Sequence, residues 1–299
     1  MSPVLRRFIL IFGVICISSS PIWVRFSDVP SSVLVFYRML ITCIILSPVV
    51  LTKSRHAFKE VKKTSLLLCL LSGCAFGLHL FTCFQGAKFT DIASCSTLGS
   101  TEVFFVAILS FVILREKISK KAFIGIVLAF AGGAIVTMAD SSGSSFNLVG
   151  DAYALSSAVF VAFFTFIGRI VRSRGVPTMV YSFIVYATVA VIFLFVNLFS
   201  GIELIHINPV NFICALGMAI SCTLLGHTIM SWALKYEQAS FISTLKLSGP
   251  VYSCIMGVIF FMEVPGLVSL IGCLFIIAGI YCFLRANRPA EKESAAAAK

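Results

Sequence analysis

Charged side chains are scarce in this sequence of 299 residues. Only 12% of the residues are charged and only 12 are Asp or Glu, whereas 59% are hydrophobic and the mean hydropathy is +1.05. A soluble domain usually carries charge on about a quarter of its residues. So few charges cannot cover the surface of a water-soluble fold, and we therefore predict an integral membrane protein.

Several motifs of catalysis and metal binding are also missing. The sequence contains no G-x-x-x-x-G-K-[ST] loop, which argues against ATP hydrolysis of the P-loop type. Its 11 cysteines form no Cys-x-x-Cys motif and no cluster with histidine, so they are interpreted as small apolar side chains. The acidic residues are scattered and show no D-x-x-x-D pattern for a Mg²⁺-dependent transferase. We predict no catalytic residue, no metal ligand and no cofactor.

Apolar runs of about 20 residues, which are long enough to cross lipid as helices, recur along the chain. Ten are predicted, at residues 8–25, 32–51, 64–86, 91–114, 122–139, 148–169, 178–200, 210–233, 238–262 and 265–285. The first resembles a secretory signal because two arginines precede its apolar stretch. We interpret it as a retained helix, because nine further spans follow and the topology needs it.

Lys and Arg are distributed asymmetrically about these spans. Of the 23 basic residues, all but Arg25, Arg38, Lys88 and Lys246 fall at the two termini or in alternate connections. Because cytoplasmic segments are enriched in Lys and Arg, both termini are predicted to be cytoplasmic, in the plasma (bacterial inner) membrane. The asymmetry also accounts for the formal charge of +11 without a nucleic-acid partner, and it predicts contact with membrane lipid.

The two halves of the sequence share residues at a constant spacing of 147. Lys88, Ser96, Glu116, Gly125 and Gly132 recur as Lys235, Ser243, Glu263, Gly272 and Gly279. Such an ordered series indicates a duplication, with one repeat at 1–140, a second at 146–288 and a tail at 289–299. Each half has an odd number of spans, so the repeats are predicted to be inverted around a central cavity, an arrangement typical of alternating-access transporters.

Longer segments carry a family resemblance. They are SPIWVRFSDV, VFYRMLITCIILSP, LHLFTCFQGAKFTDIASCSTL and FVILREKIS in the first half, and LVGDAYALSSAVFVAFFTFIGR, GHTIMSWALKY and PVYSCIMGVIFFMEVP in the second. Together they resemble the EamA family of the drug/metabolite transporter superfamily. The resemblance implies ten helices around a cavity and transport of small metabolites. The second repeat of the family often reads Glu-Pro where this sequence has Gly249-Pro250, and only the first half keeps the acidic residue, as Glu102.

Glu102 and Lys246 are the principal candidates for a site. Lys246 aligns with Gly99, three residues before Glu102, so on antiparallel helices the two charges are expected about 4–5 Å apart in depth, at 1.5 Å per residue. Pro250 cannot donate to the carbonyl of Lys246, which predicts a free carbonyl beside them. One interpretation is a site for a zwitterion, in which Lys246 binds the anionic group and Glu102 binds an amine or a coupling proton. The alternative is a structural ion pair.

Weaker candidates lie in other spans. His79 and His227 occupy nearly equivalent repeat positions, and each is either a proton relay or a packing histidine. Arg38 either binds a carboxylate or extends toward the interface. Five aromatic residues either wall the cavity or pack in the bundle: Trp23, Tyr153, Phe163, Trp232 and Tyr252.

These observations favour a secondary transporter of amino acids or related zwitterions, with a small-molecule substrate as its partner. A carrier for a nucleoside-type metabolite such as S-adenosylmethionine is the alternative. A membrane-embedded transferase or a receptor is a more distant one. The sequence leaves monomer and dimer open.

Overall fold

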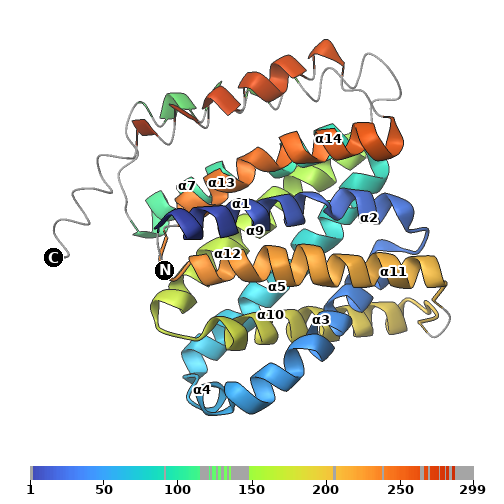
Figure 1. The fold of residues 1–299 in the computed structure, drawn as a ribbon, viewed down its shortest axis with the longest axis vertical. Coiled ribbons are helices and arrows are strands. Elements are labelled where there is room, and N and C mark those ends of the chain that lie inside the picture. The colour runs from blue at the N-terminus through green and yellow to red at the C-terminus, as the bar shows by residue number, and fades with distance from the viewer. Residues whose placement is uncertain are drawn as a thin grey trace.

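A computed structural model of the chain describes residues 3–90, 92–114, 148–204, 207–237 and 239–262, together with short stretches between 121 and 135 and between 266 and 286. Every regular element in these ranges is a helix (Figure 1). The predicted span at 122–139 falls mainly outside the described residues, the span at 265–285 is described only in separate short stretches, and the tail at 289–299 falls wholly outside them.

The other eight predicted spans coincide with helices, and several are divided into shorter elements. The first half contains α1 (Pro3–Ser18), α2 (Ser20–Phe26), α3 (Ser31–Lys53), α4 (Arg55–Lys59), α5 (Lys63–Phe89), α6 (Ile92–Gly99) and α7 (Glu102–Leu114). The second contains α9 (Leu148–Ser173), α10 (Thr178–Phe199), α11 (Pro209–Met218), the π-helix Ala219–His227, α12 (Thr228–Ala233), α13 (Ala239–Leu245), the 3₁₀ turn Lys246–Ser248 and α14 (Gly249–Phe261).

Within the described residues, six helical stretches are long and apolar enough to cross a membrane. They are Phe8–Phe26, Ser31–Lys53, Lys63–Phe89, Leu148–Ser173, Thr178–Phe199 and Pro209–Ala233. Large apolar side chains lie on the outside of the bundle, and Phe199 is 87% exposed. Helices satisfy their own backbone hydrogen bonds and can therefore place such side chains in lipid. The composition and the helices together confirm a multi-pass membrane protein.

Two helices are interrupted at equivalent places in the two halves. The break between α6 and α7 falls at Ser100 and Thr101, and the 3₁₀ turn between α13 and α14 begins at Lys246. At a spacing of 147, Ser100 and Thr101 correspond to Leu247 and Ser248, inside that turn. α6 packs against α14 and α7 against α13, so the two broken helices run antiparallel and their breaks meet.

Proline explains the second break and corrects one prediction. Pro250 has no amide hydrogen to donate four residues back, so the α-helical hydrogen bond to Lys246 is missing. The amide of Gly249 donates to the carbonyl of Lys246 instead, which tightens the chain into the 3₁₀ turn. The prediction of a free carbonyl at Lys246 is therefore wrong, because the turn supplies a donor one residue earlier.

The core lies where α5 packs against α9 and where α10 packs against α3 and α5. Its buried residues include Phe76, Phe84, Tyr181 and Tyr186. At one end of the α5–α9 contact, Gly150 approaches the backbone of α5. A Cβ atom at Gly150 would lie 2.9 Å from the carbonyl carbon of Phe89. Small residues allow such close approach between helices in lipid.

We expect Gly150→Val to lower the free energy of unfolding by about 1–3 kcal/mol, because a backbone atom cannot move aside for the new side chain. Ala152→Val is the matched control, since Ala152 lies on the same helix and is exposed. Thermal unfolding of both variants in one detergent measures the difference. Equal melting temperatures for the two variants would contradict the close contact.

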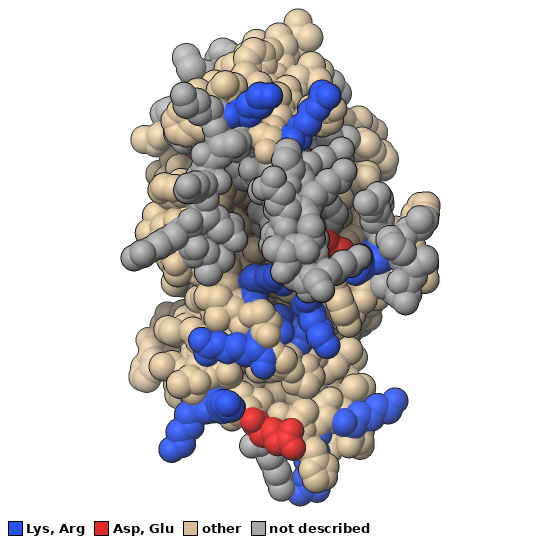
Figure 2. Space-filling view, turned by 90° about the vertical axis from the view of Figure 1, so that its left-hand side faces the viewer, with Lys and Arg blue, Asp and Glu red and all other residues tan. Residues whose placement is uncertain are grey.

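Basic residues gather at one end of the bundle, here called the basic end: Lys53, Arg55, Lys62, Lys63, Arg174 and Lys235, all exposed. Figure 1 shows α1 beginning at the same end as α4, and Figure 2 shows that Lys and Arg greatly outnumber Asp and Glu on that face. Segments 57–65 and 174–177 line a common cavity of about 540 Å³ there. Arg6 forms an ion pair with Glu237 at 3.0 Å, and Arg169 donates to the carbonyl of Leu234.

A second set of polar contacts joins the helices at the opposite end. Arg25 on α2 donates to the carbonyls of Ala87 and Thr90 at the end of α5, at 2.9 and 2.8 Å. Thr90 in turn donates to Asp151 at 3.0 Å. These contacts join the end of α2 and the end of α5 to the start of α9, at the end of the bundle away from the basic residues.

Candidate functional site

A cavity of about 110 Å³ lies in the middle of the bundle. Its walls come from α1, α2, α3, α5, α6, α7, α9, the π-helix, the 3₁₀ turn and α14. Five candidates from the sequence line it: Arg38, His79, Glu102, His227 and Lys246. Residues separated by up to 208 positions in the chain are therefore brought to one site.

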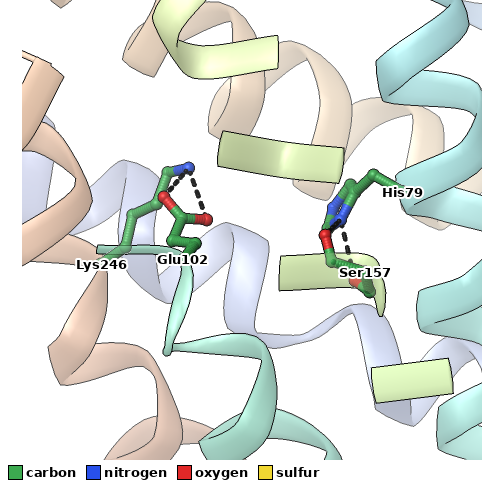
Figure 3. A network of polar contacts seen from close by, with 4 residues as sticks. All are labelled: His79, Glu102, Ser157 and Lys246. Carbon is green, nitrogen blue, oxygen red and sulfur yellow. Dashed lines mark hydrogen bonds and ion pairs between the residues drawn. The ribbon is translucent and has the colours of Figure 1, made fainter. Parts of the chain in front are cut away.

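Glu102 and Lys246 form an ion pair at the point where the two broken helices cross. The ammonium of Lys246 lies 2.9 Å from Glu102 Oε1 and 3.2 Å from Oε2 (Figure 3). Their side chains are only 7% and 12% exposed, respectively. The prediction that these charges are neighbours is confirmed.

The helix breaks place each of these charges at a favourable helix end. Glu102 is the first residue of α7, and Lys246 directly follows the last residue of α13. A helix carries partial positive charge at its N-terminus and partial negative charge at its C-terminus. The carboxylate and the ammonium each face the complementary end, which offsets part of the cost of holding charge within the bundle.

His79 lies across the cavity from this pair. Its Nδ1 atom is 2.9 Å from the hydroxyl of Ser157 on α9 and 3.1 Å from the Ser157 carbonyl. Figure 3 shows the polar ends of the two pairs pointing toward the space between them. The cavity thus has a charged wall at the helix breaks and a neutral polar wall where α5 meets α9.

Arg38 is completely buried on α3 and does not extend to the membrane interface. Its Nε donates to Thr223 at 2.8 Å, and its Nη1 lies 3.4 Å from the hydroxyl of Ser20. The guanidinium carbon lies 5.7 Å from the centre of the Phe84 ring. Among the described residues no carboxylate pairs with Arg38, and its Nη2 has no hydrogen-bond partner.

The π-helix supplies two residues to this region. Thr223, which receives the hydrogen bond from Arg38, donates to the carbonyl of Met218 five residues back. His227 ends the π-helix, is only 4% exposed and has no partner at Nδ1. Its ring centroid lies 6.2 Å from that of His79. Single π turns inside α-helices frequently occur at functional sites.

The five aromatic candidates are not among the described residues that line the cavity. Trp23 packs against Gly217, Tyr153 stacks on Phe89, and Trp232 lies beside Tyr236. Tyr252 packs against a smaller apolar cluster on α1, α9 and α12, and Phe163 is 41% exposed on the surface of the bundle. In the structure these five side chains therefore make packing or surface contacts away from the cavity wall.

Hydroxyl groups form a part of the wall that the sequence analysis missed. Ser18, Ser20, Ser96, Ser100, Ser157 and Ser253 all line the cavity. Serine is common in membrane helices, where its hydroxyl bonds either within its own helix or to a neighbouring helix. Its presence alone therefore does not mark a site. The sequence offered two signals for this wall: the run Ser18-Ser19-Ser20 beside a proline, and the recurrence of Ser96 as Ser243 in the second half. In the described part of the chain, no three His, Cys, Asp or Glu residues are grouped so that they could hold a metal ion.

Comparisons with known proteins agree with the helical membrane fold. An uncharacterized transporter of Archaeoglobus fulgidus is 29% identical over 70% of this chain and 75% of its own length. The pseudopaline exporter CntI of Pseudomonas aeruginosa is 24% identical over 88% of this chain and 89% of its own. A solved crystal structure of a protein superposes with a TM-score of 0.73 at 17% identity, covering 96% of this chain and 99% of that one.

These relatives are transporters and not enzymes, in agreement with the prediction from the sequence. The model of the EamA-like transporter family matches residues 7–138 and again residues 148–285. Because these two matches include most of the chain, the protein belongs to the EamA-like transporter family.

Proposed function

We propose that the protein is a secondary transporter that moves small polar metabolites across the membrane by alternating access, without ATP hydrolysis. The observation that carries the proposal is the ion pair of Glu102 and Lys246 in the wall of the central cavity. Ionisable groups at this depth are costly and mark substrate or ion pathways. Helices broken at equivalent positions of two halves are the arrangement in which transporters build such sites.

The substrate class that fits this wall best is an amino acid or a related zwitterion. A substrate ammonium group competes with Lys246 for the carboxylate of Glu102, and a coupling proton acts on the same carboxylate. The pair joins the start of α7 to the 3₁₀ turn that follows α13. A ligand that replaces either Glu102 or Lys246 in the ion pair breaks this link between the two helices. A ligand that binds the separated arrangement more tightly shifts the protein toward it, as alternating access requires.

The ten-helix inverted repeat is part of this proposal. The family model matches twice in succession, as two copies of one unit would. The breaks at Ser100 and at Lys246 fall 146 to 147 residues apart, in the register of the duplication. Two five-helix halves of opposite orientation supply the two-state rocking motion around a fixed site.

Counterflow in liposomes tests the function directly. Vesicles that contain the reconstituted protein and are loaded with an unlabelled amino-acid mixture should accumulate labelled amino acids transiently above equilibrium. S-adenosylmethionine is the second probe, because it joins an amino-acid group to a nucleoside body. Ligands for this assay are found by thermal shift, since a compound that binds only the folded state raises the melting temperature. Binding without counterflow for every ligand found would indicate a receptor and contradict the proposal.

We further propose that the basic end faces the cytoplasm, in the plasma (bacterial inner) membrane, because Lys and Arg are retained on that side. A cysteine at Ser200, which is exposed beyond α10, is expected to react with a membrane-impermeant maleimide in intact cells. A cysteine at Ser173, exposed at the other end of the bundle, should react only after permeabilisation. The parent protein with its native cysteines provides the background, and the reverse pattern of labelling would invert the topology.

A further inference from the structure

We propose that Arg38 and His227 form a carboxylate-binding subsite in the central cavity, so that the transported substrate carries a monovalent anionic group held by these two side chains. This inference rests on the proposed transport function and adds the chemical class of one end of the substrate. The sequence analysis gave the anionic group of a zwitterion to Lys246 and left Arg38 as either a carboxylate ligand or an interfacial residue; the structure favours Arg38, together with His227.

The first argument is the charge balance of the cavity. Three charged side chains line it among the described residues, and two of them, Glu102 and Lys246, already neutralise each other at 2.9 Å. Arg38 therefore remains as one uncompensated positive charge. A buried charge without a partner is strongly unfavourable, and natural proteins pair such charges. A monovalent anionic group of the substrate neutralises the charge of Arg38, whereas a divalent group would leave an excess of negative charge beside it.

The second argument is the set of contacts that hold Arg38. Thr223 accepts from Nε and Ser20 lies within reach of Nη1, and both are neutral hydroxyl groups from other helices. They fix the plane of the guanidinium without neutralising it. The Nη2 atom is buried and has no hydrogen-bond partner. A guanidinium presents several donors in a rigid fork that matches the geometry of a carboxylate.

The third argument is that a second unpartnered group lines the same cavity. His227 is 4% exposed, and its Nδ1 atom is buried without a partner. Buried polar groups are nearly always hydrogen-bonded, so two such atoms at one cavity require an explanation. An imidazole nitrogen that carries hydrogen can donate to one carboxylate oxygen while Arg38 donates to the other. A bound carboxylate thereby satisfies both orphan groups at once.

The structural alternative makes a different prediction for stability. A structural arginine contributes hydrogen bonds that its removal breaks, as for Arg172, which is 3% exposed, donates to backbone carbonyls and is not among the residues that line the cavity. A ligand-binding arginine lowers the free energy of unfolding of the empty protein, and this loss is offset only when the ligand is bound. Replacing Arg38 by an apolar side chain of similar length should therefore leave the empty protein as stable as before, or more stable.

The test measures melting temperature for the full-length protein in detergent, in sodium propionate, sodium phosphate and sodium chloride at equal ionic strength. We expect propionate to raise the melting temperature of the wild type relative to chloride, and Arg38→Met to abolish this shift while keeping the melting temperature in chloride. Arg172→Met, the matched control, should lower the melting temperature in chloride yet keep the propionate shift. His227→Phe, which retains a ring beside Phe76, should weaken the response.

Three results would overturn the subsite. One is a propionate shift that survives in Arg38→Met, and another is stabilisation of the wild type by phosphate but not by propionate. The third is an unchanged response in His227→Phe, which would remove the histidine from the site. Counterflow by the same variants separates this inference from the proposed function: flux that is equal in wild type and Arg38→Met contradicts the subsite alone, whereas a propionate shift without any wild-type flux contradicts transport alone.

Discussion

Glu102→Gln and Lys246→Met are each expected to lower the free energy of unfolding by about 3–5 kcal/mol, because each leaves the remaining charge buried without a partner. The side chains are only 7% and 12% exposed, so water can solvate the stranded charge only slightly. The double variant should recover to within about 1 kcal/mol of the wild type, since removing both members of a buried pair is often neutral. Denaturant titration in mixed micelles measures all three differences.

The pair of Arg6 and Glu237 provides the control for this cycle. Its N–O distance of 3.0 Å is close to the 2.9 Å of the central pair, but its side chains are 30% and 24% exposed at the basic end. Solvated ion pairs contribute about 0–1 kcal/mol, so Arg6→Met should have a small effect. If Lys246→Met were no more destabilising than Arg6→Met, the central pair would have to be solvated, and the argument from burial would fail.

The position of this pair was predictable because two constraints act on it together. A charge in a membrane helix needs a partner, and Glu102 and Lys246 are the charges that the 147-residue register brings to similar depth on antiparallel helices. The ion pair confirms this prediction. The 147-residue spacing does not predict the local hydrogen bonds. The prediction of a free carbonyl at Lys246 was wrong because the 3₁₀ turn supplies the amide of Gly249 as its donor.

The environment of Arg38 could not be predicted from the sequence. Its partners, Ser20 and Thr223, lie 18 and 185 residues away, and serine or threonine hydroxyls commonly bond within their own helix, as that of Thr223 also does. The π-helix that presents Thr223 and His227 results from a one-residue shift in hydrogen-bond register, for which the sequence carries no distinct pattern. Aromatic residue type did not identify the residues that line the cavity, because an aromatic ring suits a packed interface, a lipid surface and a binding site alike.

Transport is expected to remain lost in the double variant Glu102→Gln with Lys246→Met, even though its fold recovers. If Glu102 binds a substrate amine or a coupling proton, the neutral amide removes that interaction, and restoring stability does not bring it back. Loss of a buried charged contact to a ligand costs about 2–5 kcal/mol, and each 1.4 kcal/mol is a factor of ten. Initial counterflow rates should therefore fall by about a hundredfold, at equal amounts of folded protein in the vesicles.

The exchanged pair, Glu102→Lys with Lys246→Glu, extends this prediction. It retains an ion pair between α7 and α13, but each charge now faces the unfavourable end of its helix. Stability should lie between that of the single variants and the wild type, while counterflow stays as low as in the uncharged double variant, because the carboxylate has moved to the other helix. Recovery of both stability and counterflow in the uncharged double variant would show instead that Glu102 and Lys246 are a structural ion pair, and the site would then have to be sought around Arg38 and His227 alone.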